Sequence, residues 1–378
     1  MVILKFVSYN IKMREYSFQT KLLHNKYKYD KATGGVSVPI QNASTFHQLE
    51  VGKFGDFDYS RSGNPTRAAL EDTIAELEGG MRGFAFSSGM AAISTALLLL
   101  SAGDHLIVTE DVYGGAYRVI VQILSKLGIE HTFVDMNNID EVKKSIQKNT
   151  KAFYMETPSN PTLKVTNMEP IVAIAKEIGA LTFVDNTFLT PLLQRPFDIS
   201  VDVIIHSATK FLGGHSDVTA GLVVVNNKEL GDELYFLQNS MGTILGPNDC
   251  WLVLRGIKTL HVRLKEACVS AQKVADYLRE HPKVKKVHYP NVGCVLSFEL
   301  ENVVAIKVFH KYIDIPVFAV SLGGVESILS YPAKMSHAAM PKEEREKRGV
   351  TDTLLRLSVG IENVDDIIED IKCALEKI

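Results

Sequence analysis

The stretch that decides the fold is DVIIHSATK, residues 202–210, which is followed closely by GGHSD at residues 213–217. Its apolar first half is typical of a buried strand, and the glycines behind it are typical of a tight turn. Lys210 therefore stands past the end of a strand, with the hydroxyls of Ser207 and Thr209 shortly before it. An amine beside hydroxyls and glycines is what a phosphorylated aldehyde cofactor requires. The alternative is an ordinary surface lysine, because most lysines are exposed.

Strands and helices alternate on both sides of this stretch. Apolar runs predict strands at His105–Val108, Thr132–Val134, Ala152–Met155, Leu181–Val184, Val203–His206 and Gly221–Val225. Helical periodicity predicts helices at Thr66–Leu77, Ala91–Leu100, Tyr117–Leu127, Ile139–Gln147 and Met168–Ile178. This alternation is typical of an α/β fold, in which helices cover both faces of a large, mostly parallel sheet.

The pattern changes after residue 248. One long helix is expected from Asp249 to about Arg279, where Pro282 stops it. Shorter strands are expected at Val284–His288, Val295–Leu300, Val317–Val320 and Leu354–Val359, and helices at Val303–Lys311, 342–348 and Val364–Glu376. We therefore expect three parts: an extension and arm at 1–62, an α/β domain at 63–248 and a smaller C-terminal α+β domain at 249–378. Residues 1–12 show little pattern and are expected to be a disordered extension.

The composition argues against several classes of protein. The 378 residues are 46% hydrophobic, and their formal net charge of −3 gives no sign of a nucleic-acid or membrane-surface partner. No apolar run reaches the ~18 residues of a membrane span. The cysteines are far apart, so neither a metal site nor a redox motif is expected, and free thiols fit a reducing cytoplasm. They are Cys250, Cys268, Cys294 and Cys373.

Asp185 ends the apolar strand that precedes the Lys210 strand. Ligands of an open parallel sheet bind outside the carboxyl ends of its strands, so Asp185 and Lys210 can face one pocket. A carboxylate in that pocket can keep a pyridine nitrogen protonated, as pyridoxal phosphate requires. A cap of a turn or helix is the other interpretation of an aspartate in this place.

Two further segments could bind the same cofactor. The run Ser88-Gly89-Met90 opens a predicted helix, whose backbone N–H groups can bind an anion, although a simple N-cap explains Ser88 equally well. Tyr113 stands before two glycines in a turn. Its ring could stack on a cofactor and its hydroxyl could transfer a proton, or it could be an ordinary packed tyrosine.

Two arginines occupy unusual positions. Arg61 lies close to Tyr59 in the extended arm, and its planar guanidinium suits a phosphate. Arg356 is embedded in the apolar run LLRLSV. Because an unpaired buried charge is costly, Arg356 should face either the carboxylate of a ligand or an internal carboxylate.

Several strings of this sequence resemble one family, and they occur in the family's order over nearly the whole chain from Thr20. They are YSRSGNPTR from Tyr59, SSGMAAI from Ser87, DVYGGAYR from Asp111, ETPSNPT from Glu156, VDNTFLTP from Val184, SATKFLGGHSD from Ser207, RGIKTLHVR from Arg255, SLGGVES from Ser321 and LRLSVGIE from Leu355. The chain thus resembles the Cys/Met-metabolism enzymes of fold type I, which use pyridoxal 5′-phosphate. This family includes cystathionine γ-synthases, cystathionine γ-lyases, cystathionine β-lyases and methionine γ-lyases.

The resemblance implies a role for each candidate residue. Lys210 would bond to the cofactor aldehyde and later remove a substrate proton, Asp185 would pair with the ring nitrogen, and Tyr113 would stack on the ring and donate a proton. The phosphate would be held by Gly89, Met90, Ser207 and Thr209, and, from the neighbouring subunit, by Tyr59 and Arg61. The substrate carboxylate would be held by Asn160, Ser321 and Arg356. A homodimer is then the minimal active unit, and a homotetramer is expected from the family.

The resemblance favours replacement at the γ-carbon of an activated homoserine ester by cysteine, which gives cystathionine, with γ-elimination as a side activity. The alternative is a cystathionine γ-lyase, which gives cysteine, 2-oxobutyrate and ammonia. A methionine γ-lyase or a non-catalytic cofactor-binding homologue is favoured less. The signature is mixed, because Val320 replaces an acidic residue frequent in the γ-enzymes, and Gly115 stands where methionine γ-lyases carry cysteine. The segment 289–293 is also shorter than in relatives, and we expect this to shorten the packing there without loss of activity.

Overall fold

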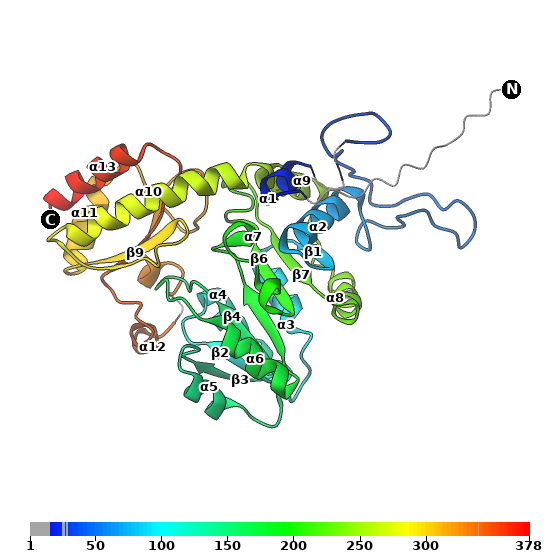
Figure 1. The fold of residues 1–378 in the computed structure, drawn as a ribbon, viewed down its shortest axis with the longest axis horizontal. Helices are drawn as coiled ribbons and strands as arrows, with labels where there is room; N and C mark the ends of the chain where they lie inside the picture. Colours follow the sequence, from blue (N-terminus) through cyan, green and yellow to red (C-terminus); the bar gives the residue numbers. More distant parts are fainter. Residues whose placement is uncertain (1–15, 25–26, 28, 339) are drawn as a thin grey trace.

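The structure is a computed structural model, and it describes residues 16–24, 27, 29–338 and 340–378. The expected disordered extension at 1–12 lies outside the described residues. The described chain forms two β-sheets, one of seven strands and one of five, each packed against helices. The two sheets lie at different ends of the molecule, with the C-terminus beside the smaller one (Figure 1).

The larger sheet has the strand order β1-β7-β6-β5-β4-β2-β3. Its strands are β1 (Arg82–Phe86), β2 (His105–Thr109), β3 (Glu130–Val134), β4 (Thr150–Glu156), β5 (Leu181–Asp185), β6 (Val203–Ser207) and β7 (Gly221–Val225). Only β7 pairs antiparallel, with β1 and β6, and every other pair is parallel. The prediction of a large, mostly parallel sheet is confirmed.

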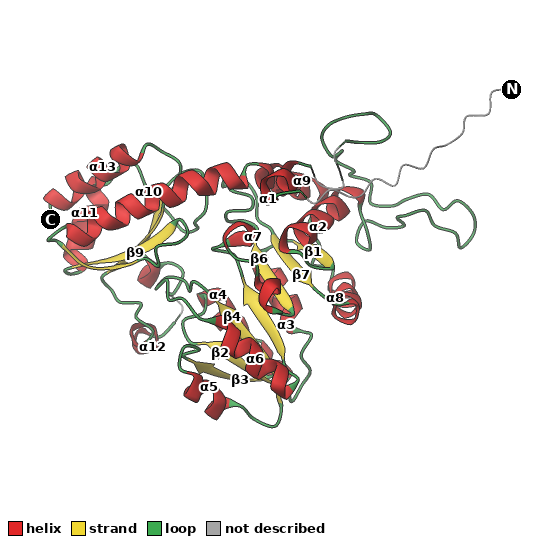
Figure 2. Ribbon diagram, in the orientation of Figure 1, coloured by secondary structure: helices red, strands yellow, loops and turns green. Residues whose placement is uncertain are grey.

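Each face of this sheet buries its own core, because successive side chains of a strand point to opposite faces. Val184 and Ile204 belong to the core beneath one face, whereas Phe183 and Ile205 belong to the core of the other. The first core is closed by α2 (Pro65–Glu78), α6 (Met168–Ile178) and α9 (Pro247–Lys258). The second is closed by α3 (Gly89–Leu97), α4 (Gly114–Gln122) and α8 (Lys228–Met241). Figure 2 shows these strands between helices.

The smaller elements of this part differ from the predictions in detail. The helix expected at Tyr117–Leu127 begins earlier, at Gly114, and after Gln122 it gives way to a 3₁₀ turn, η1 (Leu124–Leu127), that Gly128 ends with φ 81°. The helix α8 was not expected. Short elements complete the part: α1 (Phe18–Leu23), α5 (Ile139–Ser145), α7 (Thr190–Leu193) and η2 (Pro196–Ile199).

The single long helix expected at Asp249–Arg279 is wrong, because the chain bends at Thr259 between α9 and α10 (Leu260–Glu280). The guanidinium of Arg263 donates to the carbonyl of Gly256 at 2.8 Å, which takes up an acceptor that a continuous helix would use. Gly256 also packs directly on Gly213, where an added Cβ would lie 2.1 Å from the Gly213 carbonyl oxygen. The bend therefore follows from packing against the loop behind Lys210.

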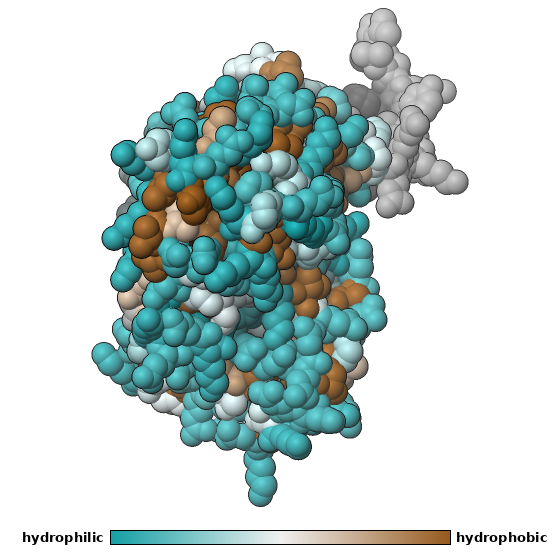
Figure 3. Space-filling model, turned by 90° about the vertical axis from the view of Figure 1, so that its left-hand side faces the viewer, coloured by the Kyte–Doolittle hydropathy of each residue, from teal (hydrophilic) through white to brown (hydrophobic). Residues whose placement is uncertain are grey.

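The smaller sheet has the order β10-β11-β12-β9-β8. Its strands are β8 (Val284–His288), β9 (Val295–Leu300), β10 (Val317–Phe318), β11 (Ile328–Ser330) and β12 (Leu354–Ser358). Helices α10, α11 (Val303–Tyr312) and α13 (Val364–Glu376) bury its apolar side. The short strand β11 was not expected, and β10 is shorter than predicted. Figure 3 views the molecule from the end that carries this sheet, where the surface is mostly hydrophilic with hydrophobic patches between.

The expected exposed helix at 342–348 is α12 (Lys342–Lys347), although Arg345 within it is buried, and η3 (Pro332–Lys334) precedes it.

Two of the free cysteines lie together in the fold. Cys268 and Cys294 are distant in sequence, and their sulfur atoms are 3.2 Å apart. Within the described residues, no helix is long and apolar enough to cross a membrane. The exact domain boundaries at 62 and 248 stay predictions.

Candidate active site

A cavity of ≈ 210 Å³ lies at the carboxyl ends of β4, β5 and β6, beside the start of α3. This is where ligands of open parallel sheets bind. The cavity brings together eight of the residues predicted from the sequence: Gly89, Met90, Tyr113, Asn160, Asp185, Ser207, Thr209 and Lys210. Its wall also contains residues that were not predicted, among them Glu156, Thr187 and Phe188.

Lys210 is largely buried in this wall, in the turn that follows β6. Its Nζ donates a hydrogen bond to Oγ of Ser321 at 2.9 Å. Burial, and secondly the positive charge of Arg356, lower the pKa of Lys210 to about 8. A substantial fraction of this amine is therefore neutral near physiological pH, and a neutral amine is the nucleophile that attacks an aldehyde.

Asp185 is the last residue of β5 and is 7% exposed. Its Oδ1 accepts hydrogen bonds from the backbone N–H of Thr187 at 3.0 Å and from the Thr187 hydroxyl, and Oδ2 lies 3.5 Å from the hydroxyl of Tyr154. Burial raises the pKa of Asp185, and the two bonds from Thr187 oppose that shift. Asp185 thus caps a turn, as its alternative interpretation held, and also lines the cavity.

The start of α3 approaches β6 very closely. An added Cβ on Gly89 would lie 2.7 Å from Cβ and 2.8 Å from Oγ of Ser207, so only glycine fits between them. Ser88 caps the helix, because its Oγ accepts from the N–H of Ala91 at 3.0 Å. Gly89 and Met90, the first residues of this nine-residue helix, line the cavity together with Ser207, and the N-terminus of a helix suits an anion.

Thr209 also lines the cavity, but its hydroxyl already has backbone partners. Oγ1 donates to the carbonyl of Ala220 at 3.2 Å and accepts from the Ala220 N–H at 3.0 Å. The single hydrogen of this hydroxyl is therefore committed to Ala220, so Thr209 could donate to an anion only by sharing it, and Ser207 is the less committed of the two hydroxyls.

Tyr113 stands at the N-terminus of α4, where its backbone N–H donates to Oε2 of Glu156 at 2.8 Å. Its ring packs tightly over the first turn of the helix. A Cβ added to Gly115 would lie 2.4 Å from Cε1 of Tyr113 and 2.7 Å from Sδ of Met90. A cysteine at position 115 therefore requires Tyr113 or Met90 to move.

Glu156 was missed by the sequence reasoning. It ends β4 directly beside Asp185 and accepts the N–H of Asn160 at 3.0 Å as well as that of Tyr113. Burial, followed by the negative charge of Asp185, raises the pKa of Glu156 well above its usual range. An acidic residue at the end of an apolar strand was the signal that identified Asp185, and the same signal was present here.

Arg356 lies on β12 of the smaller sheet and is 3% exposed. Its guanidinium donates to Oδ1 of Asn160 at 2.8 Å, to the carbonyl of Ser321 at 2.6 Å and to Oγ of Ser330 at 3.1 Å. Its Nε is buried without a partner, and no ion pair to Arg356 forms among the described residues. Burial lowers its pKa to about 10. The internal salt bridge is thus excluded within the described chain, and a cation with only neutral partners favours the carboxylate of a ligand.

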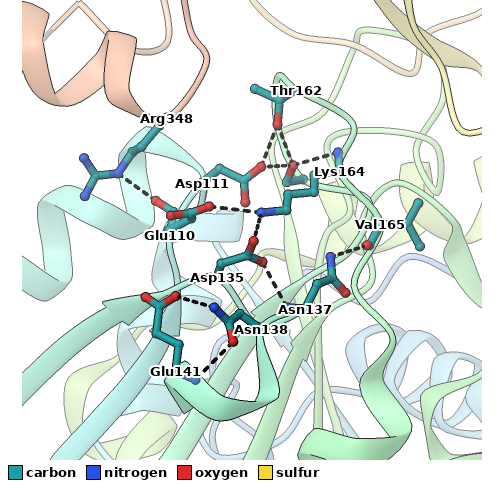
Figure 4. Close-up of polar contacts among 11 residues, drawn as sticks. Glu110, Asp111, Asp135, Asn137, Asn138, Glu141, Thr162, Lys164, Val165 and Arg348 are labelled. Carbon is teal, nitrogen blue, oxygen red and sulfur yellow. Dashed lines mark hydrogen bonds and ion pairs between the residues drawn. The ribbon is translucent and has the colours of Figure 1, made fainter. Parts of the chain in front are cut away.

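The loop that carries Asn160 is anchored from below by a polar network (Figure 4). Asp111 accepts hydrogen bonds from Ser159 and from Thr162, the latter at 2.6 Å. Lys164 bridges Glu110 at 3.0 Å and Asp135 at 2.7 Å. Arg348, next to α12, donates from Nε to the carbonyl of Glu110 at 2.7 Å. These bonds hold the loop in which Asn160 accepts a hydrogen bond from Arg356 of the smaller sheet at 2.8 Å.

Tyr59 and Arg61 are not part of the cavity wall within this chain. They belong to the segment between α1 and α2, whose loops project from the body (Figure 1), and Tyr59 is 46% exposed. Arg61 donates to the carbonyl of Asn239 at 2.6 Å, and the buried Arg67 holds the turn by donating to the carbonyls of Ser60 and Arg61 at 2.6 and 3.0 Å. Their expected contact with a neighbouring subunit stays a prediction.

The side chains of the cavity fit a phosphorylated pyridine aldehyde. They provide an amine with a lowered pKa at Lys210, a carboxylate at Asp185 and an anion site at the start of α3. Because Gly89 has no side chain, the start of α3 can lie against Ser207 without filling that anion site. These are the groups that hold pyridoxal phosphate through its aldehyde, its ring nitrogen and its phosphate.

Comparisons with known proteins agree with this geometry. Residues 19–376 match the model of the family described as Cys/Met metabolism PLP-dependent enzyme. Cystathionine beta-lyase MetC of Bacillus subtilis (strain 168) is 61% identical over 96% of this chain and 97% of that protein, and cystathionine gamma-lyase of the same organism is 48% identical over 95% and 99%. The crystal structure of cystathionine gamma-lyase from Lactobacillus plantarum complexed with L-serine has a TM-score of 0.93 and 43% identity, over 96% of this chain and 99% of that chain. Cystathionine gamma synthase from Xanthomonas oryzae pv. oryzae in complex with cystathionine has a TM-score of 0.94 and 38% identity, with the same coverage.

Proposed function

The chain belongs to the Cys/Met metabolism PLP-dependent enzyme family, and on that premise we propose that it is a cystathionine lyase that breaks the bond between sulfur and the β-carbon. The products are homocysteine, pyruvate and ammonia. The membership establishes a PLP-dependent enzyme of sulfur amino-acid metabolism, and the bond that is broken is the proposal.

The choice of bond rests on the relatives. Four of them, 50% to 61% identical to this chain over 96% of it, are named cystathionine beta-lyase. Those named for γ-chemistry are less similar, at 48% for a gamma-lyase and 46% for a gamma-synthase/O-acetylhomoserine (thiol)-lyase. Cleavage at the β-carbon also asks less of the site, since it needs removal of the α-proton only, whereas γ-chemistry needs a second proton removed from the β-carbon.

We assign the cofactor contacts by the chemistry of each group. Bound pyridoxal phosphate supplies an electron sink that stabilises negative charge on the substrate α-carbon. The N–H groups of Gly89 and Met90 and the hydroxyl of Ser207 would hold its phosphate, with Thr209 sharing its hydroxyl hydrogen, and with Tyr59 and Arg61 of a neighbouring copy. Asp185 would hold the proton of the ring nitrogen, and the ring of Tyr113 would stack on the pyridine.

The substrate lies between Lys210 and Arg356. In this proposal the guanidinium of Arg356 and the amide nitrogen of Asn160 bind its α-carboxylate, because the buried Arg356 donates to Oδ1 of Asn160, which lines the cavity. Lys210, once its amine is free, takes the α-proton. In this proposal the hydroxyl of Tyr113, which lines the cavity, donates a proton to the departing sulfur.

The γ-replacement expected from the sequence stays as the second candidate. It is supported by the likeness to the Xanthomonas gamma synthase, whose fold matches along 96% of this chain. A cystathionine γ-lyase is the third. A methionine γ-lyase is disfavoured, because its cysteine at position 115 does not fit against Tyr113 without a rearrangement.

One experiment distinguishes the candidates. Purified holoenzyme is incubated with cystathionine, and the 2-oxo acid and the thiol are identified by mass. Pyruvate with homocysteine supports β-cleavage, and 2-oxobutyrate with cysteine supports the γ-lyase. Cystathionine formed from cysteine and O-acetyl-, O-succinyl- or O-phosphohomoserine, without cleavage of cystathionine, supports the γ-synthase. No turnover by enzyme that holds its cofactor supports the non-catalytic homologue.

A further inference from the structure

A buried polar network lies on the far side of the larger sheet from the cavity. Oε1 of Glu78 lies 2.6 Å from Nε2 of His206 and accepts from Nδ2 of Asn186 at 3.0 Å. All three residues are 0% exposed. Asn186 also exchanges hydrogen bonds with Gln194, at 2.9 Å in each direction. A fully buried network of this kind needs a reason, because burying charge and amides is costly.

The network lies directly behind the cofactor contacts. Asp185 and Ser207 line the cavity on the α3 side. Asn186 and His206 are their immediate neighbours in the chain, and alternation along β5 and β6 turns these side chains to the opposite face, where α2 carries Glu78. The N–H of Asn186 also donates to the carbonyl of Ile205 at 2.9 Å. Glu78 thus bonds to the end of β6 through His206 and to the residue after β5 through Asn186. Asp185 and Ser207 lie at the same two strand ends, on the opposite face of the sheet.

The position of Glu78 is unfavourable for a carboxylate unless a cation accompanies it. Glu78 is the last residue of α2, where the helix dipole repels negative charge. Its Oε1 accepts from Nδ2 of Asn186 and lies 2.6 Å from Nε2 of His206, and of these two partners only His206 can carry a positive charge. Within the part of the chain that the structure describes, Oε2 of Glu78 and Nδ1 of His206 have no hydrogen-bond partner, so the hydrogen bonds of this pair do not satisfy all its polar atoms.

Other charges face the pair. On the cavity side are Asp185 and, beside it, Glu156, two adjacent buried carboxylates that repel each other. On the α2 side is Arg195, whose guanidinium packs against Gly79, where an added Cβ would lie 2.4 Å from Nη2. A positive charge on His206 would lower the pKa of Asp185 and so favour its ionised form. The same charge is not among the main causes that shift the pKa of Glu156.

We propose that Glu78 and His206 are positioning residues for the cofactor: they fix the ends of β5 and β6, and as an ion pair they keep Asp185 a carboxylate opposite the pyridine nitrogen. This inference rests on the family membership and is independent of which bond the enzyme breaks. It concerns binding and protonation of the cofactor, so its failure leaves the proposed reaction untouched.

The test compares Glu78→Gln and His206→Gln with Glu76→Gln, an exposed glutamate on the same helix. Both test variants keep side chains that can form the hydrogen bonds but remove the charge. The readouts are the dissociation constant of pyridoxal phosphate from the apoprotein, the pH midpoint of the visible absorbance of the bound cofactor, and the thermal unfolding midpoint. We expect roughly tenfold weaker cofactor binding and a pH midpoint displaced by about one unit for both test variants. Glu76→Gln should match the parent.

Two results would overturn the proposal. One is a folded His206→Gln protein whose cofactor affinity and pH midpoint equal those of the parent. This variant lacks the proposed cation, so the result counts even if Glu78→Gln does not fold. The other is a lowered unfolding midpoint in either variant without a displaced pH midpoint, because a purely structural network predicts that pattern.

Discussion

Ser321 joins the two ends of the candidate site through one residue: its hydroxyl accepts from Nζ of Lys210 at 2.9 Å, and its carbonyl accepts from Arg356 at 2.6 Å. The amine of Lys210 and the guanidinium of Arg356 therefore bond to the same residue. Ser321 has φ 101°, a conformation that an L residue adopts only when its surroundings hold it there. Ser321 thus links the turn after β6 of the larger sheet to β12 of the smaller sheet.

The pH dependence of cofactor attachment follows from Lys210. Burial lowers the pKa of this lysine to about 8, below that of an ordinary lysine, so its nucleophilic neutral form grows as pH rises and is dominant above 8. The rate of cofactor incorporation into the apoprotein, followed by absorbance, should rise about tenfold per pH unit well below 8 and level off above it. A rate that keeps rising to pH 10 would show that Lys210 titrates normally.

Arg356→Ala should weaken substrate binding while the cofactor stays bound. Removing a charge-assisted partner costs about 1.5–3 kcal/mol, so we expect KM to rise roughly 10- to 100-fold. Arg279→Ala, which removes a partly exposed arginine of α10, serves as the control and should leave KM unchanged. An unchanged KM in Arg356→Ala would remove this residue from the substrate site.

Gly89→Ala should disrupt the anion site. The added methyl would lie 2.7 Å from Cβ of Ser207, so the start of α3 must move away from β6. We expect cofactor affinity, measured by titration of the apoprotein, to fall at least about tenfold. Gly55→Ala is the matched control, because nothing lies within 4 Å of its added Cβ. Equal affinity in the two variants would contradict the assignment of the phosphate to this helix terminus.

Mixed oligomers test whether Tyr59 and Arg61 act across a subunit boundary. Arg61→Ala and Lys210→Ala place their defects in different subunits of a shared site, so random dimers of the two inactive proteins should recover roughly a quarter of the parent activity. Asp185→Ala mixed with Lys210→Ala is the control and should recover none, because both defects belong to the same chain's site. No recovery in the first mixture would show that Arg61 acts within its own chain or not at all.

The parts of the site that could be predicted are those set by the chain's own pattern. Lys210 and Asp185 each follow an apolar run, and a parallel sheet brings strand ends together whatever the packing. Glu156 shows the same pattern. Its partners are the backbone N–H groups of Tyr113 and Asn160, and backbone groups leave no mark in the sequence that would have pointed to Glu156. The pattern alone does not tell these two carboxylates apart.

Features that depend on long-range packing could not be predicted. The bend between α9 and α10 depends on Arg263 and on the approach of Gly256 to Gly213, which the helical periodicity of 249–279 does not reveal. The contact between Cys268 and Cys294 depends on how α10 crosses the start of β9. The pairing of Glu78 with His206 likewise spans 128 residues and appears only when α2 lies under β6.

The most direct test of the central claim is chemical trapping of the cofactor. Borohydride reduces the bond between an amine and the pyridoxal aldehyde, and peptide mapping by mass spectrometry then locates the pyridoxyl group. The account predicts a single modified residue, Lys210, in the native holoenzyme, and no covalent label in Lys210→Ala. A pyridoxyl group on another side chain, or none in the native protein, would contradict it.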